Sequence, residues 1–243
     1  MHNETEHEKP THYSVNGKNL QSFAYLISAS VLISALLISG TLFYTLKSGV
    51  GTASAGTAGA AAAKPVALAV KPNTPFIGGA DAKVTVVEYA DYRCPFCERW
   101  YTSVMPELKT KYIDSGKIKF IYQDFAFLGP DSNSAAEASH CAADQNMFWQ
   151  YHDYLFGHQG DESGHWASVP NLKQFASTLG LNTTQFNTCL DSGKYKQEVL
   201  DETAAGKKYG VTGTPTVFVN GVPIVGAQPL QTFVDAIDAA LKK

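Results

Sequence analysis

The chain has 243 residues, with 19 Lys and Arg against 22 Asp and Glu, so its formal net charge is −3. This near-balance argues against an electrostatically driven nucleic-acid binder, because such proteins usually carry a basic stripe. Charged residues make up 17% of the chain, below the roughly 25% usual for soluble domains. The deficit is local, since no charged residue occurs at 19–46 or at 48–63. Residues 64–243 are long enough for one domain with a full core.

The first uncharged stretch, residues 22–46, is predominantly apolar and has Tyr25 near one end and Phe43 near the other. A helix of about 20 apolar residues crosses the hydrocarbon core of a membrane, and aromatic rings favour its two interfaces. The stretch therefore predicts an uncleaved membrane anchor that follows a polar tail at 1–21. Two other interpretations are a signal peptide cleaved near the small residues 53–55 and a buried core helix.

The second uncharged stretch consists almost entirely of Gly, Ala, Ser and Thr. Such a sequence has little to bury, which predicts a flexible linker over residues 47–75. Lysines stand in equal number on the two sides of the predicted anchor, so the positive-inside rule does not orient it. The orientation must follow from the chemistry of the folded part.

Apolar periodicity and turn residues divide the folded part into strands and helices. In chain order, the expected elements are a strand at 83–90, a helix from 94 to about 112, a strand at 117–127, a helical region at about 132–209 with interruptions near 160–170 and 180, a hairpin at 216–225 and a helix at 230–241. The Asn-Gly pair at 220–221 favours a tight hairpin turn. This order predicts an α/β layered fold interrupted by a helical insertion.

Two of the four cysteines, Cys94 and Cys97, follow the first predicted strand directly and open the next helix. A thiol at a helix N-terminus faces unpaired N–H groups and the positive end of the helix dipole, which lowers its pKa. Pro95 suits the first helical turn, where its missing N–H has no consequence. The placement predicts a redox dithiol, with Cys94 as the solvent-reachable nucleophile and Cys97 as the resolving thiol. A zinc site and a purely structural disulfide are the alternatives, and zinc lacks a second close cysteine pair.

The other two cysteines, Cys141 and Cys189, fall on predicted helices of the insertion. Outside the cytosol an even cysteine count favours pairing, so we expect a structural disulfide between them. Closing so long a loop contributes roughly 4 kcal/mol in the chain-entropy model. The alternatives are two buried free thiols and a second redox-active pair.

Three stretches together resemble the DsbA-like branch of the thioredoxin superfamily. They are VVEYADYRCPFC at 86–97, CAADQNMFWQYHDYLF at 141–156 and GVTGTPTVFVNGVPIVGA at 210–227. The resemblance covers about residues 76–243 and implies a thioredoxin-like fold with a helical insertion at about 130–208. It does not cover the predicted anchor, although membrane-tethered relatives are familiar.

The resemblance also implies roles for two further sites. Thr214 and Pro215 match the cis-proline loop that lies against the dithiol and pairs with the substrate backbone; an ordinary trans proline is the alternative. Glu88 matches the buried acid beneath the dithiol, and its strand face predicts burial and a raised pKa. Such a carboxyl can exchange a proton with Cys97 through water, or serve as a paired structural carboxylate.

The resemblance implies a membrane-tethered enzyme that introduces disulfides into cysteine-containing proteins outside the cytoplasm. It further implies reoxidation by a membrane partner of the DsbB or VKOR type, without a metal or organic cofactor. This chemistry places the N-terminus in the cytoplasm and the catalytic domain outside. Phe96 stands where the strongly oxidising member has histidine, which lowers the expected potential. The alternatives are a reductase or isomerase on the same scaffold and a non-catalytic thioredoxin-like binding module.

Overall fold

The computed structural model describes residues 64–161 and 164–243. The predicted tail, the predicted anchor at 22–46 and most of the predicted linker lie outside these residues. Within the described residues, no helix is both long enough and apolar enough to cross a membrane.

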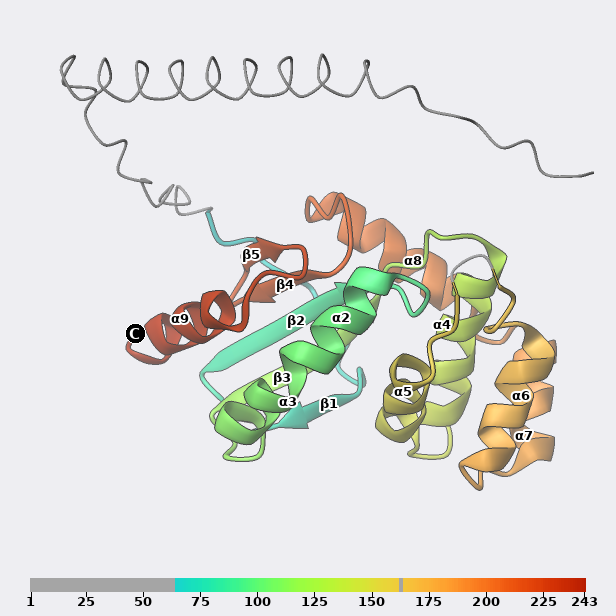
Figure 1. The fold of residues 1–243 in the computed structure, drawn as a ribbon. Coiled ribbons are helices and arrows are strands. Elements are labelled where there is room, and N and C mark those ends of the chain that lie inside the picture. The colour runs from blue at the N-terminus through green and yellow to red at the C-terminus, as the bar shows by residue number, and fades with distance from the viewer. Residues whose placement is uncertain (1–63, 162–163) are drawn as a thin grey trace, which may run out of the picture. The chain divides into compact units, whose positions relative to one another are not determined.

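A five-stranded mixed sheet forms the centre of the described part (Figure 1). Its strands are β1 (Phe76–Gly78), β2 (Val84–Ala90), β3 (Ile118–Asp124), β4 (Thr216–Val219) and β5 (Val222–Val225). They lie in the order β1-β3-β2-β4-β5, and only β2 and β3 run parallel to each other. The parallel pair is almost entirely buried, as expected for strands with helices packed over them. The short strand β1 was not predicted, because three residues are too few to show a period.

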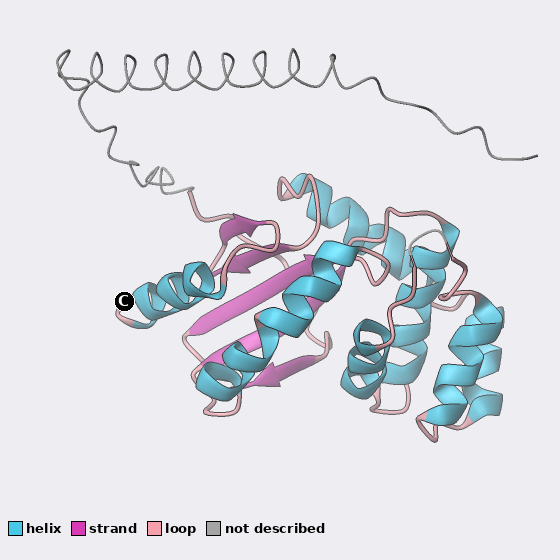
Figure 2. Cartoon of the chain, viewed as in Figure 1, coloured by secondary structure: helices cyan, strands magenta, loops and turns pink. Residues whose placement is uncertain are grey.

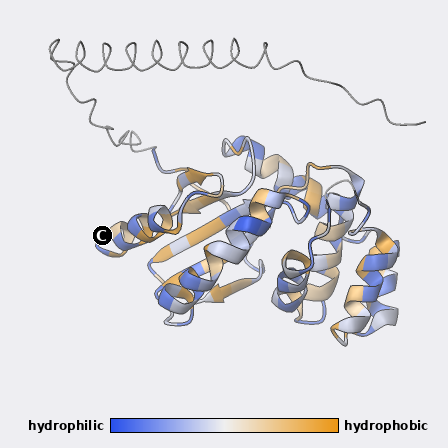
Figure 3. Ribbon diagram, in the orientation of Figure 1, coloured by the Kyte–Doolittle hydropathy of each residue, from blue (hydrophilic) through white to orange (hydrophobic). Residues whose placement is uncertain are grey.

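One face of the sheet packs against the helices that follow β2 and against the last helix, α9 (Leu230–Leu241). Figure 3 shows the central strands largely in the hydrophobic colours, whereas α9 alternates between hydrophobic and hydrophilic colours. Trp100 lies at the centre of this layer, stacked on Phe120 and in edge contact with Phe233. Burying a large apolar side chain stabilises a fold by roughly 1.5–3 kcal/mol. This layer therefore holds the helix that begins beside Cys94 firmly against the sheet.

The single helix predicted from 94 to about 112 is divided into three short pieces. They are α2 (Pro95–Ser103), α3 (Met105–Leu108) and the π-helical turn η1 (Lys109–Ile113). The break at Val104 (φ −114°) follows from Pro106, which has no N–H to donate to the carbonyl of Thr102 four residues earlier. The apolar spacing continues through the break, so periodicity alone did not reveal it.

The helical insertion forms a group of helices beside the sheet (Figure 2). It contains α4 (Pro130–Ala143), α5 (Phe148–Gly157), α6 (Val169–Thr178), α7 (Thr183–Asp191) and α8 (Lys196–Lys208). The predicted interruptions near 160–170 and 180 are present. Two more occur, one containing Asn146 (φ 58°) and one containing Gly193 (φ 61°). Residues in this left-handed conformation terminate helices. Neither interruption was predicted, because the apolar spacing continues on both sides of each.

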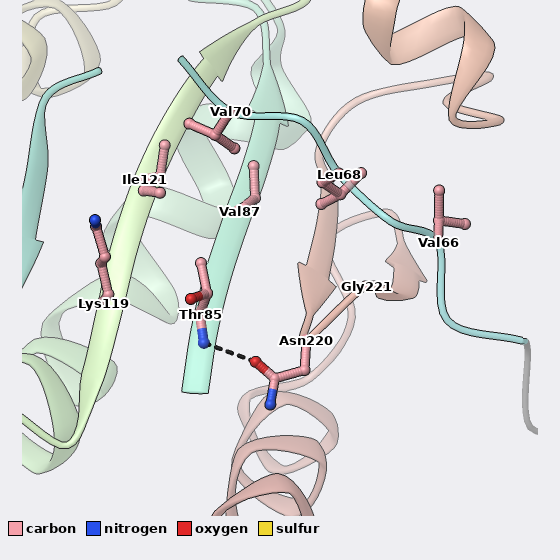
Figure 4. A pocket seen from close by; sticks show the side chains of 9 residues that line it. All are labelled: Val66, Leu68, Val70, Thr85, Val87, Lys119, Ile121, Asn220 and Gly221. Carbon is pink, nitrogen blue, oxygen red and sulfur yellow. Dashed lines mark hydrogen bonds between the residues drawn. The ribbon is translucent and has the colours of Figure 1, made fainter. Parts of the chain in front are cut away.

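Residues 64–75, which the sequence assigns to the linker, lie as an extended strap across the opposite face of the sheet. Alternate residues Val66, Leu68 and Val70 are partly buried and pack on that face. They line a cavity of about 360 Å³ between strap and sheet, shown in Figure 4. The N–H of Val66 donates to the carbonyl of Gly221 (2.9 Å) in the β4–β5 turn. Any Cβ at Gly221 would lie 2.2 Å from the Val66 carbonyl oxygen, so only glycine fits beneath the strap.

Candidate active site

Cys94 lies in the turn between β2 and α2, at the N-cap position of the helix. Its backbone is extended (φ −77°, ψ 120°), and Pro95 begins the first turn, as predicted. The Cys94 carbonyl accepts hydrogen bonds from the N–H groups of Cys97 (3.0 Å) and Glu98 (3.1 Å). The Cys94 side chain therefore stands at the end of α2 where the helix dipole favours a negative charge.

Asp91 braces this turn from within. Its backbone carbonyl accepts the N–H of Cys94 (3.0 Å). Its carboxylate accepts from the N–H of Arg93 and the hydroxyl of Ser132 at one oxygen, and from two N–H groups of the loop after β3 at the other. Burial raises the pKa of Asp91. Asp91 thus ties the dithiol turn to the start of α4, a role that its position after a strand did not by itself predict.

The two thiols of this turn have opposite acidities. A hydrogen bond from Cys97 is the main cause that lowers the pKa of Cys94 to about 6, with smaller contributions from Thr214 and from backbone N–H groups and with burial opposing. For Cys97, in contrast, burial is the main cause, and it raises the pKa well above its ordinary value. At neutral pH the first sulfur is therefore mostly thiolate while the second retains its proton.

The peptide bond between Thr214 and Pro215 is cis, as predicted, and the loop that contains it lies against the dithiol. The Cys94 thiol is 3.6 Å from the Thr214 carbonyl oxygen. Only 4% of Cys94 is exposed, less than a solvent-reachable nucleophile suggests, while Phe96 beside it is 52% exposed. The packing of the proline loop on the helix start accounts for this burial, and a periodicity argument has no access to it.

Glu88 is buried beneath the dithiol, with 2% of its surface exposed. Among the described residues, none donates a hydrogen bond to its Oε1 atom. Burial first, and the charge of Cys94 second, raise the pKa of Glu88 well above its ordinary value. The raised pKa favours the protonated form of Glu88 more than in an exposed carboxyl.

The remaining two cysteines are joined. Cys141 on α4 and Cys189 on α7 form a disulfide with an S–S distance of 2.04 Å, and both residues are buried. The bridge fixes two helices of the insertion to each other, within the cluster that also contains Tyr151 and Phe186.

One cluster of the described residues brings together three groups of the kind that ligate metals: Asp124, His140 and Glu202, whose donor atoms lie within 4.8 Å of one another. They already bond among themselves. His140 pairs with the Asp124 carboxylate (2.8 Å), and Glu202 accepts from the Asp124 N–H (2.9 Å). The cluster joins β3 to α4 and α8, and none of its members belongs to the dithiol turn.

Comparison with known proteins gives a consistent result. The sequence model of the family described as "Thioredoxin" matches residues 70–239. The "Probable disulfide bond formation protein D" of Bacillus anthracis is 33% identical over 171 residues, which is 69% of this chain and 78% of that protein. Oxidised BdbD from Bacillus subtilis superimposes with a TM-score of 0.66 at 29% identity, covering 70% of this chain and 94% of that chain. Wolbachia pipientis alpha-DsbA1 superimposes with a TM-score of 0.63 at 26% identity, covering 72% and 94%.

The mixed sheet, the helix that begins at a cysteine pair and the helical insertion define a protein disulfide oxidoreductase, an enzyme that acts on cysteine-containing proteins together with a redox partner. The chain belongs to the thioredoxin superfamily, in its DsbA-like branch. The fold class expected from the sequence is confirmed for the described residues.

Proposed function

We propose that this enzyme runs in the oxidising direction and introduces disulfides into proteins outside the cytoplasm, with Cys94 and Cys97 as its redox pair. The observation that carries the proposal is the difference in acidity between the two thiols, with a pKa of about 6 for Cys94. A couple becomes oxidising when its reduced form is stabilised, and a buried thiolate at a helix N-terminus is such a stabilisation. The relatives named for disulfide bond formation support the same direction.

In the proposed reaction a substrate thiolate attacks the Cys94 sulfur of the Cys94–Cys97 disulfide. A mixed disulfide forms at Cys94, and the Cys97 sulfur leaves with the electron pair. Because burial disfavours a thiolate at Cys97, the leaving sulfur takes a proton, which the protonated Glu88 can supply. A second substrate thiolate then attacks the substrate sulfur of the mixed disulfide, releasing the oxidised substrate and the Cys94 thiolate. Two electrons have passed from substrate to enzyme.

The loop at Thr214 and Pro215 is proposed to hold the substrate backbone during this exchange. It lies against the reacting sulfur, with the Thr214 carbonyl 3.6 Å from the thiol. Gly226 donates to the Pro215 carbonyl (2.8 Å), which ties the loop to the end of β5. A substrate segment held there would lie beside Cys94.

The proposed organisation is a cytoplasmic tail at 1–21, a membrane anchor at 22–46, a linker at 47–63 and a catalytic domain at 64–243 that includes the strap. The apolar composition of 22–46 supports the anchor. The relatives support an extracytoplasmic catalytic domain, and regeneration there calls for an oxidising membrane partner of the DsbB or VKOR type. The insertion at about 130–208 shapes the surface beside the dithiol.

Trapping tests the proposal directly. A Cys97→Ala variant lacks the thiol that would attack a mixed disulfide at Cys94. It should therefore accumulate mixed disulfides between Cys94 and substrate proteins, which mass spectrometry would identify. The reduction potential gives the direction. A value at or below that of thioredoxin, about −270 mV, would contradict the oxidase and favour the reductase or isomerase alternative. Phe96 in place of histidine leads us to expect a value below the −120 mV of DsbA.

A further inference from the structure

The dithiol turn is also held from outside the thioredoxin-like core, by a glutamine of the helical insertion. Gln159 follows α5 and is partly buried. Its Nε2 atom lies 2.6 Å from the Tyr92 carbonyl oxygen and 3.3 Å from the Cys94 carbonyl oxygen. A side-chain NH₂ group has two N–H donors, one for each of these acceptors. Because both neighbours are carbonyl oxygens and an amide oxygen cannot donate, the NH₂ end of the Gln159 side chain must face the turn.

The backbone around Gln159 is placed by packing. The next residue is Gly160, where a Cβ would lie 2.8 Å from the side chain of Trp166. On the preceding side, Phe156 of α5 packs against the Tyr92 ring at 5.0 Å between centroids. The amide is therefore delivered to the turn by a segment that is itself packed at both ends.

The Cys94 carbonyl is the acceptor that matters for chemistry. It already receives the N–H groups of Cys97 and Glu98, which form the first turn of α2. A carbonyl oxygen is the negative end of a dipole, and this one belongs to the same residue as the reacting sulfur. A donor placed on it offsets that negative charge, which favours the thiolate.

We propose that Gln159 is a positioning residue for the redox dithiol, which aligns the Cys94 carbonyl and stabilises the Cys94 thiolate from the helical insertion. The proposal rests on the proposed function of Cys94 as the nucleophile. It gives the insertion a direct electrostatic part in the chemistry, carried by one side chain that spans 65 positions of sequence to the cysteine.

The test uses the purified, reduced full chain and the variants Gln159→Leu and Gln159→Glu. Leucine keeps most of the side-chain volume and removes both donors. A single hydrogen bond of this kind corresponds to a factor of about 2 to 10 in an equilibrium. We expect the pH profile of Cys94 alkylation to move to higher pH and the equilibrium with glutathione to shift about threefold toward the oxidised enzyme. Glutamate should shift both further in the same direction, because its carboxylate oxygens face two carbonyls.

Gln145 supplies the matched control. It is also a glutamine of the insertion that makes two backbone hydrogen bonds, to the carbonyl (3.3 Å) and the N–H (2.8 Å) of Asn182. Gln145→Leu should lower the thermal midpoint while leaving the alkylation profile and the glutathione equilibrium unchanged. The proposal is overturned if Gln159→Leu lowers only the thermal midpoint, or if Gln145→Leu moves the profile as much.

Two results separate this proposal from the function on which it rests. If the unmodified chain already alkylates as an ordinary thiol, the proposed role of Cys94 fails. If the unmodified chain has an acidic Cys94 and both Gln159 variants retain it, only the proposal for Gln159 fails. Should the leucine variant not fold, the nearly isosteric glutamate variant decides by the same two measurements.

Discussion

The chain contains two cysteine pairs in one oxidoreductase, and the two pairs differ in nearly every respect. Cys141 and Cys189 are 48 positions apart, lie within helices and are bonded to each other. Cys94 and Cys97 are three positions apart, lie at the start of a helix and are free thiols. All four are buried, so burial by itself does not distinguish a reactive pair from a structural one.

The difference lies in what surrounds each sulfur. The Cys141–Cys189 bridge lies among apolar and aromatic side chains of the insertion. Cys94 is surrounded by donors: a thiol, backbone N–H groups and the end of a helix. Burial is the main cause that raises the pKa of its partner Cys97, and the neighbouring Cys94 sulfur adds to it. We attribute the proposed reactivity to this difference between the two pairs, and the predictions below test it.

The largest effect is expected from removing the reactive sulfur. A Cys94→Ser variant should lose all turnover in the oxidation of a reduced protein substrate, because a hydroxyl can neither form the enzyme disulfide nor accept the attack. Activity measured on the purified variant, with circular dichroism to verify folding, tests this. Turnover that survives would contradict the nucleophile assignment, and an undiminished binding activity would favour a non-catalytic module.

Removing the Cys141–Cys189 disulfide should lower the stability of the enzyme and leave its turnover nearly unchanged. A Cys141→Ser and Cys189→Ser double variant should lose about 4 kcal/mol of unfolding free energy, because the denatured chain regains the freedom of a long loop. Urea unfolding measures this loss. Turnover per folded molecule should stay within about twofold of the unmodified enzyme. A large fall in turnover, at a temperature where the variant is folded, would indicate that the second pair takes part in electron transfer.

The stability of the reduced enzyme should depend on pH through Cys94. Its pKa is about 6 in the folded enzyme, against an ordinary value of about 9 for a cysteine thiol. A lowered pKa contributes stability that is fully present above the unfolded value and is lost as pH falls through the folded one. The advantage of the reduced over the oxidised form should therefore shrink by about 3 kcal/mol from pH 8.5 to pH 5. Denaturant unfolding of both forms measures it, and an advantage independent of pH would contradict the acidic thiol.

A smaller effect is expected from the acid under the pair. Glu88→Gln removes the proton donor while keeping the side-chain shape, so formation of the mixed disulfide should slow about tenfold or more. The acidic alkylation profile of Cys94 should persist, because Glu88 is not among the groups that lower the pKa of that thiol. Stopped-flow kinetics across pH measures the rate of mixed-disulfide formation separately from the ionisation of Cys94. A rate unchanged at every pH would leave Glu88 without a role in proton transfer.

Local patterns along the chain were enough for much of the fold. The short β-branched run at 83–90 and the apolar spacing at 230–241 predict β2 and α9 nearly residue by residue, because β2 is buried on both faces and α9 buries one side. The interrupted helix at Val104 and the break at Asn146 were missed, since a proline two positions into a helix and a left-handed asparagine leave the surrounding apolar spacing intact. The strap over residues 64–75 was predicted as linker, because its short run of Val66, Leu68 and Val70 gives no sign of the sheet face that it covers.

The sequence by itself predicted the proposed redox pair, since Cys94 and Cys97 lie within one helical turn and their placement needs only local backbone geometry. It also indicated which acid and which proline accompany them, through the family resemblance. Only the tertiary structure decided what reaches that turn from elsewhere: the carboxylate of Asp91 bonded to two loops, and the amide of Gln159 arriving from the insertion. Contacts between residues far apart in sequence depend on how separate elements pack, and no local period records that packing.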